Sequence, residues 1–207
     1  MTAELSRQER RKQRTRQRLL DAARRVMARS GYESTGILDI TEEADVSKAT
    51  FYLHFTDKED LTRTLIMEGF EELRARVDET LGEVHRPGRM AEALRVVYRY
   101  AAEKRDLFQI MLGTQASGEL NLLAFNYWTD VVQSILARSG VSAETLPVSP
   151  EMLAQFVAGA CVRLGLWWMA DHHGLSSDEI ADITARLLRD GVFHWLPPEL
   201  RSPDLTD

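Results

Sequence analysis

The chain has 207 residues, of which 44% are hydrophobic and 28% are charged, and its formal net charge is −6. These values are typical of a globular protein of one or two domains. The single cysteine, Cys161, excludes an intrachain disulfide framework and favours a reducing, cytoplasmic location. No apolar run approaches the ~20 residues of a membrane span, and the N-terminus lacks the apolar core of a secretory signal, so no membrane partner is expected.

Positive charge gathers near the N-terminus although the whole chain is acidic. The segment from Arg7 to Arg29 contains only two acidic residues, Glu9 and Asp21. Its basic residues are Arg7, Arg10, Arg11, Lys12, Arg14, Arg16, Arg18, Arg24, Arg25 and Arg29. Such asymmetry indicates a surface for a polyanion, although a solvated basic tail explains the segment equally well when it is considered alone.

The first two elements expected along the chain are helices. Apolar residues recur at helical spacing over residues 19–27, and Gly31 is expected to end this helix. A short helix is expected over residues 37–44, with Gly36 or Thr35 as its N-cap. Neither this region nor the rest of the chain has a sustained strand-like alternation, so the predicted fold class is all-α.

The next two elements are a short helix and a long one. Ser47 is a suitable N-cap for a helix over residues 48–55. Residues 56–59 read Thr-Asp-Lys-Glu, a capping box that predicts the start of a helix over residues 57–83. The Pro-Gly pair at residues 87–88 then ends this helix. We expect the long helix to connect an N-terminal domain to a C-terminal one.

The second half of the chain also has a helical pattern throughout. Four or five further helices are expected, and proline or a capping box marks the start of two of them. These helices are expected over residues 90–104, 107–112, 119–138, 150–171 and 176–195.

A helix-turn-helix pattern spans residues 37–55, because only three residues separate the second and third expected helices. Phe51 and Phe55 are four residues apart and lie on one side, where they would hold the third helix to a core. The outward positions are Lys48, Ala49, Thr50, Tyr52 and His54. An ordinary helical hairpin would carry Glu/Lys pairs there, whereas these side chains suit base edges and phosphates in the DNA major groove.

The motif has a recognisable relative. The segment ILDITEEADVSKATFYLHFTDKEDL (residues 37–61) resembles the DNA-binding head of the tetracycline-repressor-like (TetR) family of bacterial regulators, and so does the preceding SGYEST (residues 30–35). The matching region covers residues 19–65. The resemblance implies an N-terminal three-helix helix-turn-helix DNA-binding domain, residues 8–68, and a C-terminal helical ligand-binding and dimerisation domain, residues 69–207.

The resemblance also implies roles for single residues of the head. Lys48, Ala49 and Thr50 match the positions that face bases. The positions that match phosphate contacts are Ser47, Tyr52, His54 and Lys58. The basic segment before residue 19 would add salt-dependent, sequence-independent affinity.

The head departs from the family pattern at three positions. Asp45 stands where glycine is usual, in a turn expected to have positive φ, which aspartate tolerates better than most residues. Its charge would lower the affinity for DNA beside a phosphate. Gly36 replaces a hydroxyl cap, and Thr41 replaces an alanine and needs a partner for its hydroxyl.

The second domain contains many aromatic residues, which as a group favour a pocket for an apolar or aromatic ligand. For any single aromatic, core packing or a dimer interface is the more frequent role. The candidate ligand-binding residues are Phe108, Met111, Gln115, Phe125, Trp128, Phe156 and Trp168. Small and apolar residues of the last two helices predict a dimer interface, with the candidates Gly165, Ile180, Ile183, Leu187 and Gly191.

These observations predict a dimeric, sequence-specific DNA-binding transcriptional regulator. We expect it to be a repressor that a small, mostly apolar or aromatic ligand releases from a pseudo-palindromic operator. The chain has no enzyme motif, and the pair His172-His173 lacks a partner cluster, so neither an enzyme nor a metal or other cofactor is expected. The alternative is a DNA-binding interaction or architectural protein whose C-terminal domain binds a protein partner or no ligand.

Overall fold

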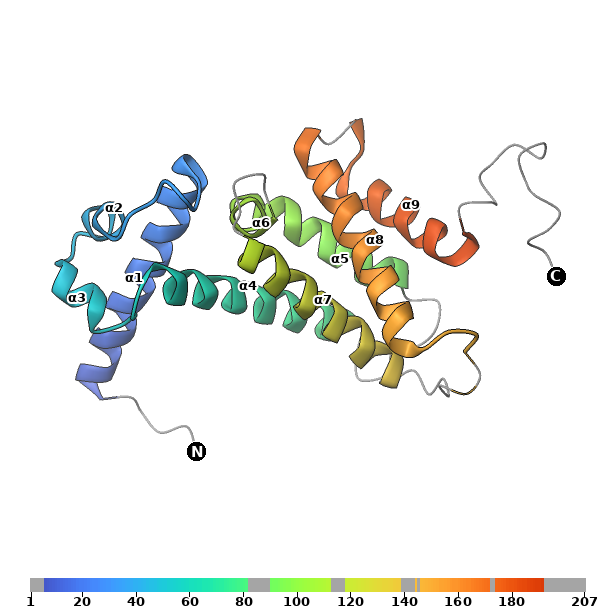
Figure 1. Ribbon diagram of the computed structural model, residues 1–207, viewed down its shortest axis with the longest axis horizontal. Coiled ribbons are helices and arrows are strands. Elements are labelled where there is room, and N and C mark those ends of the chain that lie inside the picture. Colours follow the sequence, from blue (N-terminus) through green and yellow to red (C-terminus); the bar gives the residue numbers. More distant parts are fainter. Residues whose placement is uncertain are drawn as a thin grey trace. The chain divides into compact units, whose positions relative to one another are not determined.

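A computed structural model describes residues 6–81, 90–112, 118–138, 144, 146–171 and 174–191 of the chain (Figure 1). Within these residues the structure consists of helices and the turns between them, so the prediction of an all-α fold is confirmed. The chain divides into two compact units. The first contains residues 1–72 and 104–124, and the second contains residues 73–103 and 125–207. The predicted domain boundary after residue 68 stays a prediction.

The first unit is built around helix α1 (Arg7–Ser30), with α2 (Ile37–Glu43) packed against α1 and α3 (Lys48–Tyr52) packed against α2 (Figure 1). α1 begins where the hydroxyl of Ser6 accepts a hydrogen bond from the amide of Glu9 (3.1 Å). It ends at Gly31, which has a φ of 79° as a helix-ending glycine requires. The fully buried core of this unit includes Leu19, Leu20, Ile40, Phe51, Leu61 and Ile66.

Two further helices contribute to the first unit. The N-terminal part of α4 (Lys58–Leu81) belongs to it, and α6 (Arg105–Leu112) packs on α1. The Nε of Arg24 in α1 lies 3.0 Å from the carboxylate of Asp106 in α6. α6 is therefore linked to α1 although 82 residues of sequence separate Arg24 from Asp106, and no sequence pattern indicated this association.

Two expected details of the α3–α4 region are wrong. α3 ends at Tyr52 rather than at residue 55, because the amide of His54 donates to the carbonyl of Phe51 (2.9 Å) and the chain turns there. At the start of α4, the carboxylate of Asp57 accepts from the amide of Asp60 (2.8 Å). The cap therefore lies one residue later than the expected Thr56 capping box.

The second unit contains α5 (Met90–Glu103), α8 (Pro150–Asp171) and α9 (Ser177–Asp190), while α4 and α7 (Gly118–Arg138) contribute residues to both units. Arg95 and Arg99 of α5 form ion pairs with Asp182 (2.7 Å) and Asp178 (2.5 Å) of α9. The expected capping box at Ser176 and Glu179 is present. α9 ends at Gly191, with a φ of 73°, rather than near residue 195.

The centre of the second unit is a buried aromatic contact. The rings of Tyr98 and Trp168 meet edge to face, with 5.7 Å between their centroids, and both side chains are at most 2% exposed. The hydroxyl of Tyr98 lies 3.0 Å from that of Thr184, which satisfies both buried groups. A Cβ on Gly165 would lie 3.4 Å from the Tyr98 ring, so this glycine allows close packing within one chain.

Candidate nucleic-acid interface

Helix α3 has one buried side and one exposed side. The hydroxyl of Ser47 accepts from the amide of Thr50 (3.1 Å) and begins the helix as expected. Phe51 and Phe55 are 0% and 3% exposed, and their rings lie 5.8 Å apart, so they hold α3 to the core. Ser47, Lys48, Ala49 and Tyr52 are exposed, whereas Thr50, His54 and Lys58 are half-buried. This arrangement leaves polar side chains on the solvent side of α3.

The turn before α3 has the strained conformation that its sequence predicts. Asp45 has a φ of 49°, the left-handed value expected at the position where the family has glycine. The amide of Val46 donates to the carbonyl of Thr41 (3.0 Å) and closes the turn. The Asp45 side chain is fully exposed, and its carboxylate lies 3.6 Å from a guanidinium nitrogen of Arg18 in α1. The carboxylate therefore points to solvent beside a cation.

The other two departures from the family pattern are also accommodated locally. The amide of Gly36 donates to the carboxylate of Asp39 (2.7 Å), so the carboxylate supplies a cap interaction that glycine itself lacks. The hydroxyl of Thr41, which is 2% exposed, donates to the carbonyl of Leu38 (3.0 Å). Neither substitution leaves a buried polar group unpaired.

Five arginines of α1 form contacts inside the unit. Arg25 and Arg29 each lie 2.8 Å from the carboxylate of Glu43 in α2, and these hydrogen bonds lower the pKa of Glu43 below its ordinary value. Arg16 pairs with Glu68 (2.6 Å). The other internally paired arginines are Arg18 and Arg24. The basic segment is therefore partly a structural brace and only partly a surface for a polyanion.

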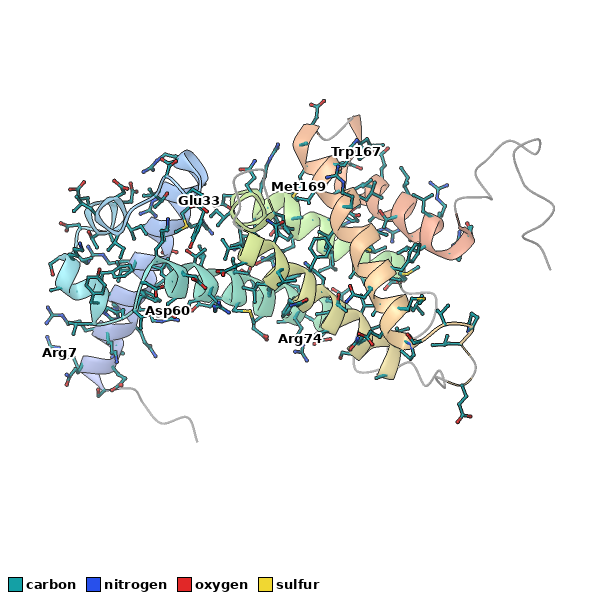
Figure 2. All side chains as sticks on the ribbon, in the orientation of Figure 1. Arg7, Glu33, Asp60, Arg74, Trp167 and Met169 are labelled. Carbon is teal, nitrogen blue, oxygen red and sulfur yellow. The ribbon has the colours of Figure 1, made fainter. Side chains whose placement is uncertain are left out.

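Four other basic residues lie on the first turns of α1. Arg7, which is labelled at the start of this helix in Figure 2, is exposed, and so are Arg11, Lys12 and Arg14. These side chains extend the positive surface of α1 before the buried core begins at Leu19.

His54 lies at the edge of this positive surface. Its ring is half-buried beside Phe55, with 6.5 Å between the ring centroids. Burial lowers the pKa of His54 below its ordinary value, and the positive charges of Lys12 and Arg16 lower it further. Its Nδ1 has no hydrogen-bond partner among the described residues. Both effects favour the neutral form of the imidazole.

Lys58 is held by its own unit. Its Nζ donates to the carbonyl of Tyr32 (2.8 Å) and lies 4.2 Å from the centre of the Tyr32 ring. These contacts fasten the first turn of α4 to the loop that follows α1. The role of Lys58 as a phosphate contact stays a prediction.

The sequence pattern missed one exposed residue of this region. Leu53 follows α3 and is 76% exposed, next to Tyr52, which is 51% exposed. Its exposure depends on the early end of α3, which the apolar spacing could not reveal.

The candidate ligand residues are distributed over both units. Phe108 and Met111 are buried in α6 of the first unit, while Trp168 is buried in the second, where its indole donates to the carbonyl of Leu175 (2.8 Å). Phe125 and Trp128 of α7 are half-buried, and Phe156 of α8 is 66% exposed. Gln115 lies outside the described residues. Packing contacts thus account for Trp168 without a ligand.

The candidate dimer residues also differ in exposure. Gly165 is buried and Ile180 is 1% exposed within the single chain, whereas Ile183 and Leu187 are half-buried and Gly191 is exposed. Gly165 and Ile180 therefore face the interior of their own unit.

Helix α8 has an exposed apolar side that the sequence pattern did not identify. Met152, Phe156 and Trp167 are 61%, 66% and 43% exposed, and their spacing of four and eleven residues places them on one side of the helix. Trp167 lies near the C-terminal end of α8 (Figure 2). By length and composition alone α8 could cross a membrane, and only 33% of its most apolar window is buried. A core helix of a globular protein passes the same test.

No group of three or more His, Cys, Asp or Glu side chains that could hold a metal ion occurs in the part of the chain that the structure describes. The pair His172-His173 lies outside that part.

Two protein-family models match the chain, one in its N-terminal part and one in its C-terminal part. A family model described as "Bacterial regulatory proteins, tetR family" matches residues 19–65. A second model, described as "Transcriptional regulator C-terminal region", matches residues 89–190. The first range includes the turn, α3 and the start of α4.

Curated relatives are transcriptional regulators. The HTH-type transcriptional regulator UidR of Escherichia coli K12 is 24% identical over 158 residues, which cover 76% of this chain and 81% of UidR. The HTH-type transcriptional repressor DhaR of Mycobacterium sp. strain GP1 is 33% identical over 72 residues, which cover 35% of this chain and 36% of DhaR.

Solved structures share the fold. The regulator FadR of Bacillus subtilis, in complex with stearoyl-CoA, has a TM-score of 0.68 and 21% identity, with 85% of this chain and 98% of FadR covered. RolR in complex with resorcinol has a TM-score of 0.62 and 23% identity, with 87% of this chain and 89% of RolR covered. At these identities the similarity establishes the fold.

Proposed function

The chain belongs to the TetR family of bacterial regulatory proteins and is a DNA-binding transcriptional regulator, and from this premise we propose how its surfaces are used. It acts as a homodimeric repressor on a pseudo-palindromic operator, and a small, mostly apolar or aromatic molecule releases it. The observation that carries the proposal is the two-sided α3, with Phe51 and Phe55 buried and polar side chains on its exposed side.

The exposed side of α3 reads the major groove. Lys48 and Ala49 are accessible to base edges, where lysine suits guanine acceptors and alanine suits a thymine methyl group. The hydroxyl of Thr50 lies 2.8 Å from that of Ser47, so its methyl group is the part left for an apolar base contact. Tyr52 and His54 flank this face and contact phosphates.

A second copy of the chain covers α8. Met152, Phe156 and Trp167 form an apolar stripe on the solvent side of this helix, and burial of such side chains drives association. A two-fold dimer places two α3 helices on half-sites about one helical turn of DNA apart. This assignment gives Phe156 a role at the dimer interface rather than in a ligand pocket.

Two relatives with bound ligands and the packing of α6 on α1 support the proposed control by a ligand. RolR was solved with resorcinol and FadR with stearoyl-CoA, so the fold accommodates an aromatic ligand and a ligand with a long apolar acyl chain. In this chain α6 packs on α1, and Arg24 pairs with Asp106 across that contact. A ligand that binds better to one position of α6 thereby shifts the population of DNA-competent dimers.

The burial of Trp168, Phe108 and Met111 favours a second candidate function. In that alternative the C-terminal domain binds a protein partner or no small molecule, and these side chains serve packing alone.

The experiment has two stages. Operators are first selected from random duplexes by the purified full-length chain, and a pseudo-palindromic consensus is expected. The affinity for that operator is then measured by fluorescence anisotropy with resorcinol or stearoyl-CoA as probes, each over a concentration series. Release by either probe supports ligand control. Tight probe binding that leaves the operator affinity unchanged would contradict coupling, and failure to select any sequence would contradict the proposed function.

A further inference from the structure

We propose that Arg18 is a positioning residue that clamps the turn before α3 and does not neutralise a DNA phosphate. The inference rests on the proposed DNA-binding function and deepens it. It separates Arg18 from the other basic residues of α1, with which it would be grouped from the sequence alone.

The geometry of the clamp is specific. One guanidinium nitrogen of Arg18, Nη2, donates to the carbonyl of Ala44 at 2.6 Å and to the carbonyl of Asp45 at 3.1 Å. The same nitrogen lies 3.6 Å from the carboxylate of Asp45. Three oxygens from the end of α2 and the turn therefore surround one cationic group of α1.

The electrostatics of α2 favour this position. The last carbonyls of a helix lack intrahelical partners and carry partial negative charge, so a cation beside them is stabilised. Ala44 is the C-cap residue of α2, and its side chain is 4% exposed. Arg18 thus satisfies acceptors that the fold would otherwise leave to solvent at the edge of the core.

The clamp acts at a strained point of the backbone. Asp45 is the one non-glycine residue with positive φ among the described residues, and such a conformation persists where surrounding contacts fix it. The direction in which α3 leaves the turn depends on this conformation. Arg18 therefore fixes the orientation of the exposed face of α3 by contacts 26 and 27 residues away in the sequence.

Arg14 provides a matched comparison. It lies four residues before Arg18 on α1 and hence on the same side of the helix, and it is exposed. No ion pair of Arg14 occurs within the described residues. Arg14 is thus available to a phosphate, whereas the charge of Arg18 already has partners.

The test uses the salt dependence of DNA affinity. Loss of one phosphate contact reduces the slope of log K against log salt by about 0.9 for duplex DNA. The full-length chain is compared with Arg14→Ala and Arg18→Ala, the latter also in the Asp45→Asn background so that removal of the arginine leaves no unpaired carboxylate. Each protein is titrated with the selected operator and with a random duplex, and its thermal unfolding is recorded.

The proposal predicts opposite behaviour of the two arginine variants. Arg14→Ala weakens operator and random duplex alike and lowers the slope by about 0.9. Relative to Asp45→Asn alone, Arg18→Ala in the Asp45→Asn background keeps the slope, loses about 10-fold in operator affinity, and changes affinity for the random duplex much less, because orientation matters for base readout. Failure of the parent chain to prefer its operator would instead refute the proposed function.

Arg18→Lys keeps the test decisive where Arg18→Ala does not fold. Lysine preserves the positive charge, but its side chain is shorter and its ammonium group lacks the fixed geometry with which the Nη2 of arginine meets both carbonyls. The expected result is an unchanged salt slope with a reduced ratio of operator to random affinity. Two results would overturn the proposal that Arg18 clamps the turn. One is a ratio of operator to random affinity in Arg18→Lys equal to that of the wild-type chain, and the other is a salt slope lowered by about 0.9 in Arg18→Ala.

Discussion

Helices α3 and α8 differ in how their apolar residues are used. The apolar side of α3 is buried, because Phe51 in the helix and Phe55 just after it are at most 3% exposed, and polar side chains occupy the opposite side. In α8 both sides are apolar: Trp168 is buried, while Phe156 is 66% exposed. A short amphipathic helix reveals which side faces a polar partner. A helix that is apolar all round requires the structure to separate core from interface.

The largest effect on stability is expected on the buried side of α3. Phe51→Ala removes a ring that is 0% exposed, and deletion of a buried phenylalanine costs about 3–5 kcal/mol. We expect a large loss in the free energy of unfolding, measured by urea denaturation, together with loss of operator binding. Tyr52→Ala, at the exposed neighbouring position, is the matched control for stability. Equal stability of the Phe51 and Tyr52 variants would show that α3 lacks the two-sided burial described here.

The second effect is expected on the exposed apolar side of α8. Phe156→Asp places a charge in the proposed dimer contact, and loss of a central aromatic anchor costs about 2 kcal/mol or more in association. We expect a shift from dimer toward monomer in sedimentation equilibrium at micromolar concentration. Gln155→Asp, at the adjacent exposed position, should leave the dimer intact. A Phe156→Asp protein that remains as dimeric as the control would assign the apolar stripe of α8 to something other than a second copy.

A smaller effect is expected at the turn. Asp45→Asn removes a fully exposed negative charge and retains a side chain that tolerates positive φ. Since the carboxylate would lie near the DNA backbone, we expect a few-fold gain in affinity for both operator and random duplexes at low salt. The gain should shrink as the salt concentration rises. Unchanged or weaker binding at low salt would place this carboxylate away from the phosphates.

The smallest effect is a pH dependence at His54. The pKa of His54 is lowered in the folded state, mainly by burial. As the pH falls below the ordinary pKa of 6.5, the unfolded chain therefore takes up a proton on His54 before the folded chain does. Stability is therefore expected to fall as the pH drops from 6.5 through the lowered pKa, and His54→Gln should reduce this slope. Thermal unfolding between pH 7 and pH 5 measures it. The unsubstituted chain is the reference, and an unchanged pH slope in His54→Gln would argue against His54 as the source.

The head was predictable because its signals are local. The spacing of Phe51 and Phe55, the cap at Ser47 and the positive φ of Asp45 all depend on a few neighbouring residues, and the structure contains each of them. The end of α3 at Tyr52 was missed, since the apolar spacing continues through the turn. This error concealed the exposure of Leu53.

Contacts between distant residues could not be predicted in the same way. Arg18 and Arg25 have the same side-chain type and similar neighbours in the sequence, yet one caps a turn and the other pairs with Glu43. Gly165 and Ile180 suited a helix–helix interface, but within their own unit Gly165 approaches the ring of Tyr98 and Ile180 is 1% exposed. Small and apolar residues indicate close packing without indicating whether the partner is the same chain or another copy.

The central claim is that the exposed side of α3 reads bases, and selection of operators with Lys48→Ala tests it most directly. The wild-type chain and the variant are each used to select duplexes from one random library. We predict that both retain the same half-site spacing, while the variant loses its preference at one base position per half-site, worth about 1–3 kcal/mol. An identical consensus from both proteins, with affinity lowered uniformly on every sequence, would contradict base readout by Lys48.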